Sequence, residues 1–292
     1  MIAKVLLALA ATGVAALVTR WVAAALIPSM PVTRPNHRGI ATPTGLGIAV
    51  LVGILGGATL VAFIHAVSED SPSPAIALIA FVGIGLLGFG FGAIGFYDDL
   101  AAQPERGWRA HVPALLKGRL TPGGLKMVGG GALAFMFGAA TSTSFGWAIV
   151  DAALIALMAN LFNALDVRPG RACKAYVVGA IPLAILGHSL TVPLSATLGA
   201  VAAFALFDLR ERAMLGDAGS NAIGAILGGA IVEVHPASWF RLGLLVFLLA
   251  LTAVAEGPTL SVWIDRIRPL RAFDRLWRTD ASQVLDRNPG QG

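Results

Sequence analysis

Nine apolar segments, each close to the length of a membrane-spanning helix, follow one another with only short polar stretches between them. They are residues 3–27, 44–65, 75–97, 124–141, 146–164, 175–189, 191–207, 217–233 and 239–257. A bilayer core is about 30 Å thick, so a helix needs about 20 largely apolar residues to cross it. Only 13% of the residues are charged, whereas a soluble domain carries roughly 25%. The sequence therefore predicts an all-α, polytopic integral membrane protein with about nine or ten spans.

Basic residues lie almost entirely in the loops on one predicted side of the membrane. Seventeen of the 21 Lys and Arg residues fall in the loops 28–43, 98–123, 165–174, 208–216 and 258–292. The opposite loops, which hold none, are 66–74, 142–145, 190 and 234–238. Because short cytoplasmic loops carry the excess of positive charge, the first set is predicted to be cytoplasmic and the N-terminus to lie outside.

Two parts are expected, a transmembrane domain over 1–257 and a basic, amphipathic cytoplasmic tail over 258–292. The first apolar segment is predicted to be a retained anchor, since it is longer than the core of a typical signal peptide; a cleaved signal is the alternative. In the tail, apolar residues recur every three positions with arginines between them: Ile264, Ile267, Leu270, Phe273 and Leu276. This pattern is typical of helices that lie in the membrane interface.

Composition argues against a nucleic-acid partner and against an internal disulfide. The net charge is +5, but the basic residues form no single run, so no nucleic-acid partner is expected. Cys173 is the sole cysteine of the sequence, which excludes an internal disulfide.

Acidic and amide side chains gather where four of the apolar segments reach the predicted cytoplasmic side. They lie in 96–99, 160–166 and 216–220 and at Asp208. An acidic residue at the end of a membrane span costs free energy, which makes it a candidate functional residue. Four such ends on one face indicate a cation site that handles phosphates.

Asp98 and Asp99 are adjacent at the end of the third span. Neighbouring carboxylates repel each other, so the pair is stable mainly where a cation or a lysine neutralises it. Their hard oxygens favour Mg²⁺ or Mn²⁺, and no Cys/His cluster in the sequence indicates zinc. The alternative is that the two carboxylates simply begin a solvated loop.

Asn160, Asn163 and Asp166 are spaced by three residues, so they share one face at the end of a helix. Such a stripe can bind a polar ring or the water shell of a metal, or it can make polar contacts between helices. Arg168 and the two basic residues that follow it, Arg171 and Lys174, form a patch that suits a pyrophosphate. The charge bias of cytoplasmic loops would place basic residues there in any case.

Two glycine-rich stretches also carry candidate residues. Asp217 lies in the stretch 216–220, Gly-Asp-Ala-Gly-Ser, at the start of the eighth span. Helix N-termini favour anions, and a plain N-cap at Asp217 is the alternative. The loop 34–47 joins Arg34, His37 and Arg38 to a Pro/Gly-rich helix entry, and is interpreted as either a phosphate contact or a turn.

In order and spacing, these motifs resemble the polyprenyl-phosphate N-acetylhexosamine-1-phosphate transferases. The motifs are Phe-x-Asp-Asp at 96–99, Asn-x-x-Asn-x-x-Asp at 160–166, Gly-Asp-x-Gly-Ser at 216–220 and the loop from His37 to Gly45. This superfamily includes the phospho-N-acetylmuramoyl-pentapeptide transferase and the UDP-GlcNAc:undecaprenyl-phosphate GlcNAc-1-phosphate transferases. The resemblance extends from about residue 30 to residue 230.

The resemblance implies a fold of about ten spans in the inner (plasma) membrane with a cytoplasmic active-site cleft. There a UDP-sugar gives its sugar-1-phosphate to polyprenyl (undecaprenyl) phosphate and UMP is released, with Mg²⁺ required, in peptidoglycan or other cell-wall biogenesis. The implied catalytic residues are Asp98, Asp99 and Asp217, and the implied metal ligands are Asp217, Asp99 and Asp166. The implied substrate contacts are His37, Asn160, Asn163, Asp166, Arg168, Arg171 and Lys174.

Three departures from the family pattern keep other interpretations open. Residues 257–292 contain no histidine where the family has a histidine-rich loop, Val167 follows Asp166 in place of glycine, and Gly39-Ile40-Ala41 replaces a lysine-bearing segment. The alternatives are a non-catalytic homologue that binds lipid phosphate in envelope assembly and an ion-coupled transporter that uses Asp151. Whether the chain forms a homodimer is left open.

Overall fold

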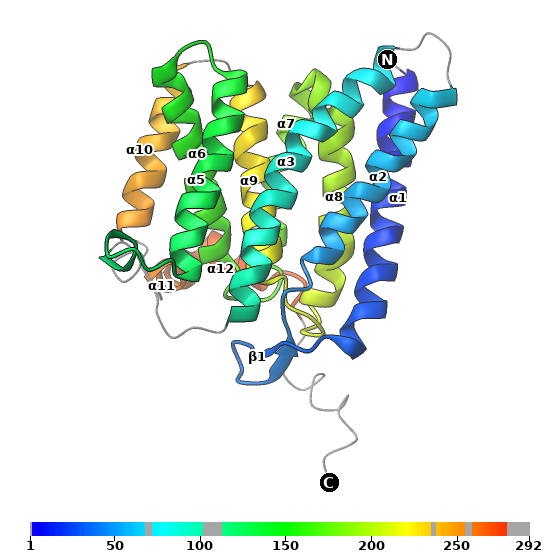
Figure 1. The fold of residues 1–292 in the computed structure, drawn as a ribbon. Coiled ribbons are helices and arrows are strands. Elements are labelled where there is room, and N and C mark those ends of the chain that lie inside the picture. The colour runs from blue at the N-terminus through cyan, green and yellow to red at the C-terminus, as the bar shows by residue number, and fades with distance from the viewer. Residues whose placement is uncertain (1, 68–71, 102–112, 235–237, 255–258, 279–292) are drawn as a thin grey trace.

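The computed structural model describes residues 2–67, 72–101, 113–234, 238–254 and 259–278. In these ranges nine helices of 16 to 30 residues run roughly alongside one another in a bundle (Figure 1). They are α1 (Ile2–Leu26), α2 (Ile48–Val67), α3 (Pro72–Ala101), α5 (Pro122–Thr141), α6 (Phe145–Leu165), α7 (Arg171–Leu186), α8 (Thr191–Asp208), α9 (Gly216–Val234) and α10 (Trp239–Val254). Each of the nine predicted spans overlaps one of these helices, and residues 255–257 of the ninth lie outside the described ranges.

Six of the helices in the described ranges are long and apolar enough to cross a membrane: α1, α2, α3, α5, α6 and α8. By contrast, α7 and α10 have 16 residues each. At 1.5 Å per residue they are about 24 Å long, shorter than a bilayer core of about 30 Å. The prediction of an all-α, multi-pass membrane protein is confirmed.

Local sequence accounts for where several of these helices begin. At the start of α5 the Thr121 side chain accepts a hydrogen bond from the Gly124 N–H at 3.0 Å, and Pro122 occupies the first helical position. Ser144 caps α6 in the same way. Side-chain oxygens before a helix satisfy N–H groups that have no partner within it, and proline is tolerated there because it lacks an N–H.

The centre of the bundle is α9, which packs most closely against α3 and α6, while α1 packs against α2 and α8. Glycines bring these backbones together. A Cβ at Gly95 of α3 would lie 2.2 Å from the Asp217 carbonyl oxygen of α9, and one at Gly224 of α9 would lie 2.6 Å from the Met158 carbonyl oxygen of α6. This close approach brings the end of α3 to the start of α9.

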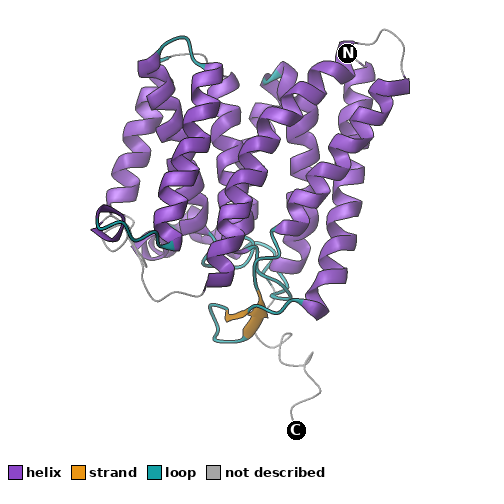
Figure 2. Ribbon diagram, in the orientation of Figure 1, coloured by secondary structure: helices purple, strands orange, loops and turns teal. Residues whose placement is uncertain are grey.

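Helices α3, α6 and α8 end, and α9 begins, at one end of the bundle, which we call the site end. The small elements gather there: the antiparallel hairpin of β1 (Thr33–Pro35) and β2 (Ala41–Pro43), and the short helices α11 (Thr259–Arg266) and α12 (Arg268–Arg275) (Figures 1 and 2). A single turn of 3₁₀ helix, η1 (Ile27–Ser29), directly follows α1. A second, η2 (His188–Leu190), directly precedes α8.

Candidate active site

A pocket of about 720 Å³ opens at the site end. Residues of α3, α5, α6, α8 and α9, of the hairpin and of the loops after α6 and α8 line it. The predicted residues that lie along it are His37, Asp98, Asp99, Asn160, Asn163, Asp166, Arg168 and Asp217. Arg171 and Lys174, both of which the structure describes, are not among the residues lining it.

The side chain of Asp99, at the end of α3, caps the first turn of α9. Its Oδ1 accepts a hydrogen bond from the Asp217 N–H at 3.1 Å, and its Oδ2 accepts one from the Ala218 N–H at 3.0 Å. The first N–H groups of a helix lack partners within the helix and carry its positive dipole end, so a carboxylate from elsewhere stabilises them. In this arrangement the side chain of Asp99 itself occupies the start of α9.

Gly216 makes this junction possible. Its φ is +70°, and a Cβ at this position would lie 2.7 Å from Oδ2 of Asp99 and 2.6 Å from the nitrogen of Gly45. Residues with a side chain rarely adopt this left-handed conformation. The glycine of the Gly-Asp motif therefore allows both the turn into α9 and the approach of Asp99.

Lys126 of α5 joins the two other predicted catalytic carboxylates. Its Nζ forms an ion pair with Oδ2 of Asp98 at 2.9 Å and a second one with Oδ2 of Asp217. The Asn163 amide also donates to Oδ2 of Asp217, at 3.2 Å. Lys126 was absent from the predicted site, although a lone basic residue within an apolar span is itself a signal of function.

Asp166 and Asp208 also line the pocket. Asp166 follows the last residue of α6, and burial, followed by the charges of Asp208, Asp217 and Asp99, raises its pKa well above the ordinary value. Asp208 Oδ2 accepts a hydrogen bond from the Gly170 N–H at 2.8 Å. That bond fixes the loop after α6 against the end of α8.

The hairpin covers one side of the pocket. Arg34 Nη2 donates to the Asp99 carbonyl oxygen at 2.8 Å, and Arg38 pairs with Glu211 at 3.0 Å. Partial burial, followed by the charges of Arg38, Arg278 and Arg168, lowers the pKa of His37 to about 4. His37 is therefore neutral near pH 7 and can contact a substrate as a hydrogen-bonding group.

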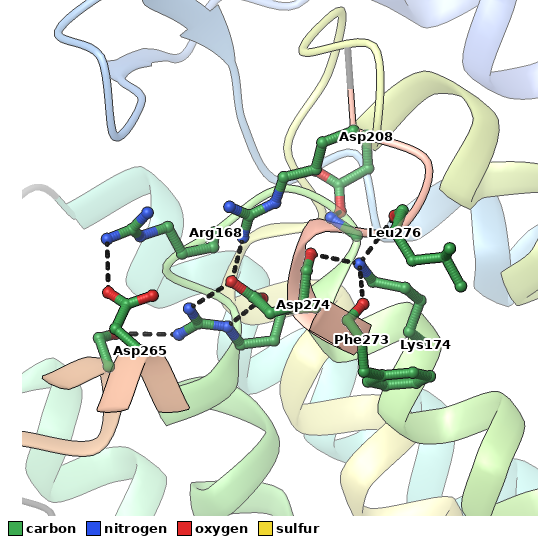
Figure 3. Close-up of polar contacts among 11 residues, drawn as sticks. Arg168, Lys174, Asp208, Asp265, Phe273, Asp274 and Leu276 are labelled. Atoms are coloured by element: carbon green, nitrogen blue, oxygen red, sulfur yellow. Dashed lines mark hydrogen bonds and ion pairs between the residues drawn. The ribbon is translucent and has the colours of Figure 1, made fainter. Parts of the chain in front are cut away.

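Arg171 and Lys174 hold the C-terminal tail. Arg171 Nε donates to Asp274 Oδ1 at 2.7 Å and Nη2 to Oδ2 at 3.1 Å, so the pair is bidentate. Lys174 Nζ donates to the carbonyl oxygens of Phe273, Asp274 and Leu276 (Figure 3).

Of the predicted pyrophosphate contacts, Arg168 lies along the pocket. It also pairs with Asp265 of α11 at 3.4 Å (Figure 3). The basic patch is thus divided between the pocket and the tail. The sequence could not separate the two uses, because they depend on where α11 and α12 fold back.

Asp151, the residue on which a transporter interpretation depends, lies in α6 away from the pocket. It is fully buried, and both of its carboxylate oxygens accept hydrogen bonds from Arg241 Nη1 of α10, at 2.6 and 2.7 Å. The Ser142 hydroxyl also donates to it. These contacts give Asp151 a structural role as the link between α6 and α10.

The pocket carboxylates offer the hard oxygens that Mg²⁺ and Mn²⁺ prefer. Within the described ranges, no three or more His, Cys, Asp or Glu side chains are grouped so as to hold a metal ion. Mg²⁺ often binds one or two carboxylates and completes its octahedron with substrate phosphates and water. The donor chemistry therefore fits, and the ligand set Asp217, Asp99 and Asp166 stays a prediction.

Comparison with known proteins identifies the family. The model of glycosyl transferase family 4 matches residues 81–235, just over half of the 292 residues, and this region contains three of the four motifs. A search of curated proteins gave no match. The chain therefore belongs to glycosyl transferase family 4, within the superfamily of polyprenyl-phosphate hexosamine-1-phosphate transferases.

Proposed function

We propose that the protein transfers an N-acetylhexosamine-1-phosphate from a UDP-sugar to polyprenyl (undecaprenyl) phosphate and releases UMP. The observation that carries this proposal is the junction of α3, α5 and α9, where Asp98, Asp99, Asp217 and Lys126 meet at the wall of one pocket. One lysine balances only part of the charge of these carboxylates, so the cluster can also take a divalent cation, which suits a reaction between two phosphate esters.

In this reaction a phosphate oxygen of the lipid attacks the phosphorus that bears the sugar. A new P–O–P bond forms, the bond from that phosphorus to the bridging oxygen breaks, and UMP leaves with the bridging oxygen and its electron pair. The two reactants are both anionic, so the barrier falls when fixed positive charge lies between them. Lys126 can supply such a charge without leaving the pocket wall.

The remaining residues fall into three groups. Asp98, which is held beside Lys126, is proposed to accept the proton of the lipid phosphate, while Asp99 positions the first turn of α9. Asp217 and Asp166 are proposed to hold Mg²⁺ or Mn²⁺, which when bound would neutralise charge on the diphosphate. Arg168, neutral His37 and the amides of Asn160 and Asn163 are proposed to contact the donor.

The site end is proposed to face the cytoplasm, because the basic loops lie there. A UDP-sugar would then reach the pocket from the cytosol and the lipid phosphate from the adjoining leaflet. The product would be the first lipid-linked sugar of a cell-envelope glycan such as peptidoglycan.

The experiment is UMP release by the purified protein in detergent with undecaprenyl phosphate, Mg²⁺ and each of several UDP-sugars. Asp217→Asn tests the site, and Glu233→Gln, which removes a carboxylate near the opposite end of α9, is the matched control. We expect release with one donor, loss of release with EDTA, and a decrease of roughly a hundred-fold or more in Asp217→Asn alone.

If no donor supports release while the folded protein still binds undecaprenyl phosphate, the catalytic proposal is wrong. The lipid-phosphate-binding homologue then becomes the better interpretation. The sequence feature that favours it is the lack of histidine in residues 257–292.

A further inference from the structure

The C-terminal tail begins next to the end of a membrane helix. The last described residue of α10 is Val254, and α11 starts at Thr259. Five residue steps span at most about 18 Å even when fully extended. The start of α11 is therefore held close to the level at which the bundle leaves the membrane.

One face of the tail is fixed to the bundle. Leu260 and Ile264 of α11 are buried, and Asp274 of α12 is 2% exposed. Arg171 holds the carboxylate of Asp274 through two hydrogen bonds, and Lys174 Nζ donates to three carbonyl oxygens of the same segment. Because α11 and α12 are anchored in this way, the orientation of their outer faces is defined.

The outer faces are rich in large apolar side chains. Trp263 is 38% exposed, Leu270 is 45% exposed and Trp277 is 73% exposed, and Val262 and Ile267 are exposed as well. Three exposed arginines lie among them: Arg266, Arg268 and Arg275. Tryptophan and aliphatic side chains beside arginines are typical of helices at a membrane interface, where the apolar groups enter the acyl boundary and the guanidinium groups meet lipid phosphates.

The pocket does not account for these exposed groups. In the described part of the tail, residues 259–278, no residue lines the pocket. The tail meets the pocket region through the pair of Asp265 with Arg168. The pocket therefore gives the exposed apolar side chains and arginines no partner, whereas the short link from α10 keeps α11 within reach of the membrane surface.

We propose that α11 and α12 form an interfacial clamp that lies on the membrane at the site end and binds the headgroups of anionic phospholipids. Val262, Trp263, Ile267 and Trp277 enter the interface, while Arg266, Arg268 and Arg275 bind the headgroup phosphates. This clamp is independent of the proposed sugar-phosphate transfer. It adds a lipid-binding surface that the pocket residues do not provide.

The test uses the full chain with a single fluorescent label on the outer face. Val262→Cys is labelled with an environment-sensitive fluorophore, and the unlabelled background is low because Cys173 is fully buried. The protein is placed in nanodiscs of phosphatidylcholine alone, or of phosphatidylcholine and phosphatidylglycerol in equal amounts. Quenching by lipids brominated on their acyl chains then reports how deeply the label lies in the membrane.

A label at Ala41→Cys, at the exposed first residue of β2, is the reference for a water-facing site. We expect strong quenching at residue 262 that increases with phosphatidylglycerol, and little quenching at residue 41. Replacing Arg266, Arg268 and Arg275 together by Gln should remove the increase, since each arginine near an anionic surface contributes roughly five-fold to binding.

A variant with Lys117, Arg119 and Arg210 changed to Gln loses the same charge outside the tail. In this variant, quenching at residue 262 should still increase with phosphatidylglycerol. Equal quenching at residues 262 and 41 would show that the tail faces water and would overturn the proposal. Quenching at residue 262 that does not change with phosphatidylglycerol, or with the tail arginines, would also overturn it.

Discussion

Asp99 accepts a 3.1 Å hydrogen bond from the backbone N–H of Asp217, 118 residues further along the chain. This bond joins the end of α3 to the start of α9, and the neighbouring N–H of Ala218 strengthens the junction. A carboxylate on two N–H groups at a helix N-terminus is fixed in position. The two acidic motifs therefore form one structural unit.

Replacing Gly216 by Ala should break this unit. The left-handed conformation costs a residue with a side chain about 1–2 kcal/mol, and the new Cβ would collide with Asp99 Oδ2 and with Gly45. We expect a lower melting temperature together with a loss of UMP release. Gly118→Ala is the matched control, because Gly118 has a similar φ of +72° but no atom within 4 Å of the added Cβ. Equal effects of the two variants would contradict the proposed contact with Asp99.

Lys126→Met should reduce turnover strongly, since it leaves Asp98 and Asp217 without their shared cation. Removing one group that stabilises charge in a transition state typically lowers kcat by about a hundred-fold or more. Lys126→Arg should restore part of the activity, and Lys117→Met, an exposed change at the same end, should have no effect. Normal turnover in Lys126→Met would rule out a role for this lysine in transfer.

Replacing Arg168 should affect substrate binding, whereas replacing Arg171 should affect the attachment of the tail. Arg168 lines the pocket, so Arg168→Met should raise KM for the UDP-sugar by roughly ten-fold, as expected when one charged hydrogen bond is lost. Arg171 is buried against Asp274. Removing one partner of a buried pair costs about 3–5 kcal/mol when the other is left without a counter-charge, and the cost is smaller here because Asp274 keeps its ion pair with Arg278.

For Arg171→Met we therefore expect trypsin to cut at the tail arginines faster than in the unmodified protein. The double variant Arg171→Met, Asp274→Leu should recover part of the resistance, because it also removes the buried carboxylate that Arg171→Met leaves with Arg278 as its ion-pair partner. If trypsin cuts the single variant no faster than the unmodified chain, the anchor is not needed to hold the tail.

Acid should release the tail only at low pH. Burial opposes ionisation of Asp274, but the hydrogen bond and the charge of Arg171, together with the charges of Arg278 and Lys174, outweigh it, so the pKa of this carboxyl is lowered. A lowered folded-state pKa means that the stabilisation is complete above the unfolded-state pKa of about 4 and is lost as the pH falls through the folded-state value. Trypsin does not work in acid, so pepsin cleavage of residues 259–278 between pH 2 and pH 5 is the measurement. Rapid cleavage of these residues already at pH 5 would contradict this account.

Arg241→Met should destabilise the bundle far from the pocket. It leaves the fully buried Asp151 unpaired, at a cost of about 3–5 kcal/mol. The double change Arg241→Met, Asp151→Leu should recover most of the loss in melting temperature. UMP release by the double variant should be normal, and a selective loss of activity in it would show that Asp151 has a functional role.

Much of the fold could be predicted because the responsible signals are local. Each apolar run became a helix, including the sixth, which has 16 residues. Because successive spans run in opposite directions across the membrane, counting them was enough to place Asp98, Asn163, Asp166 and Asp217 at one end, where the pocket lies. The roles of Lys126 and Arg171 could not be predicted, because they depend on contacts between segments 91 to 103 residues apart.

The pair of Asp151 and Arg241 also bears on how the chain is made. The two residues are 90 positions apart, and α7, α8 and α9 are synthesised between them. During synthesis, α6 therefore enters the bilayer before its cationic partner exists. We infer that assembly of this part of the bundle finishes only when α10 emerges from the ribosome. A chain truncated before residue 239 should therefore be sensitive to quality-control proteolysis, and the same truncated chain with Asp151→Leu should be less sensitive.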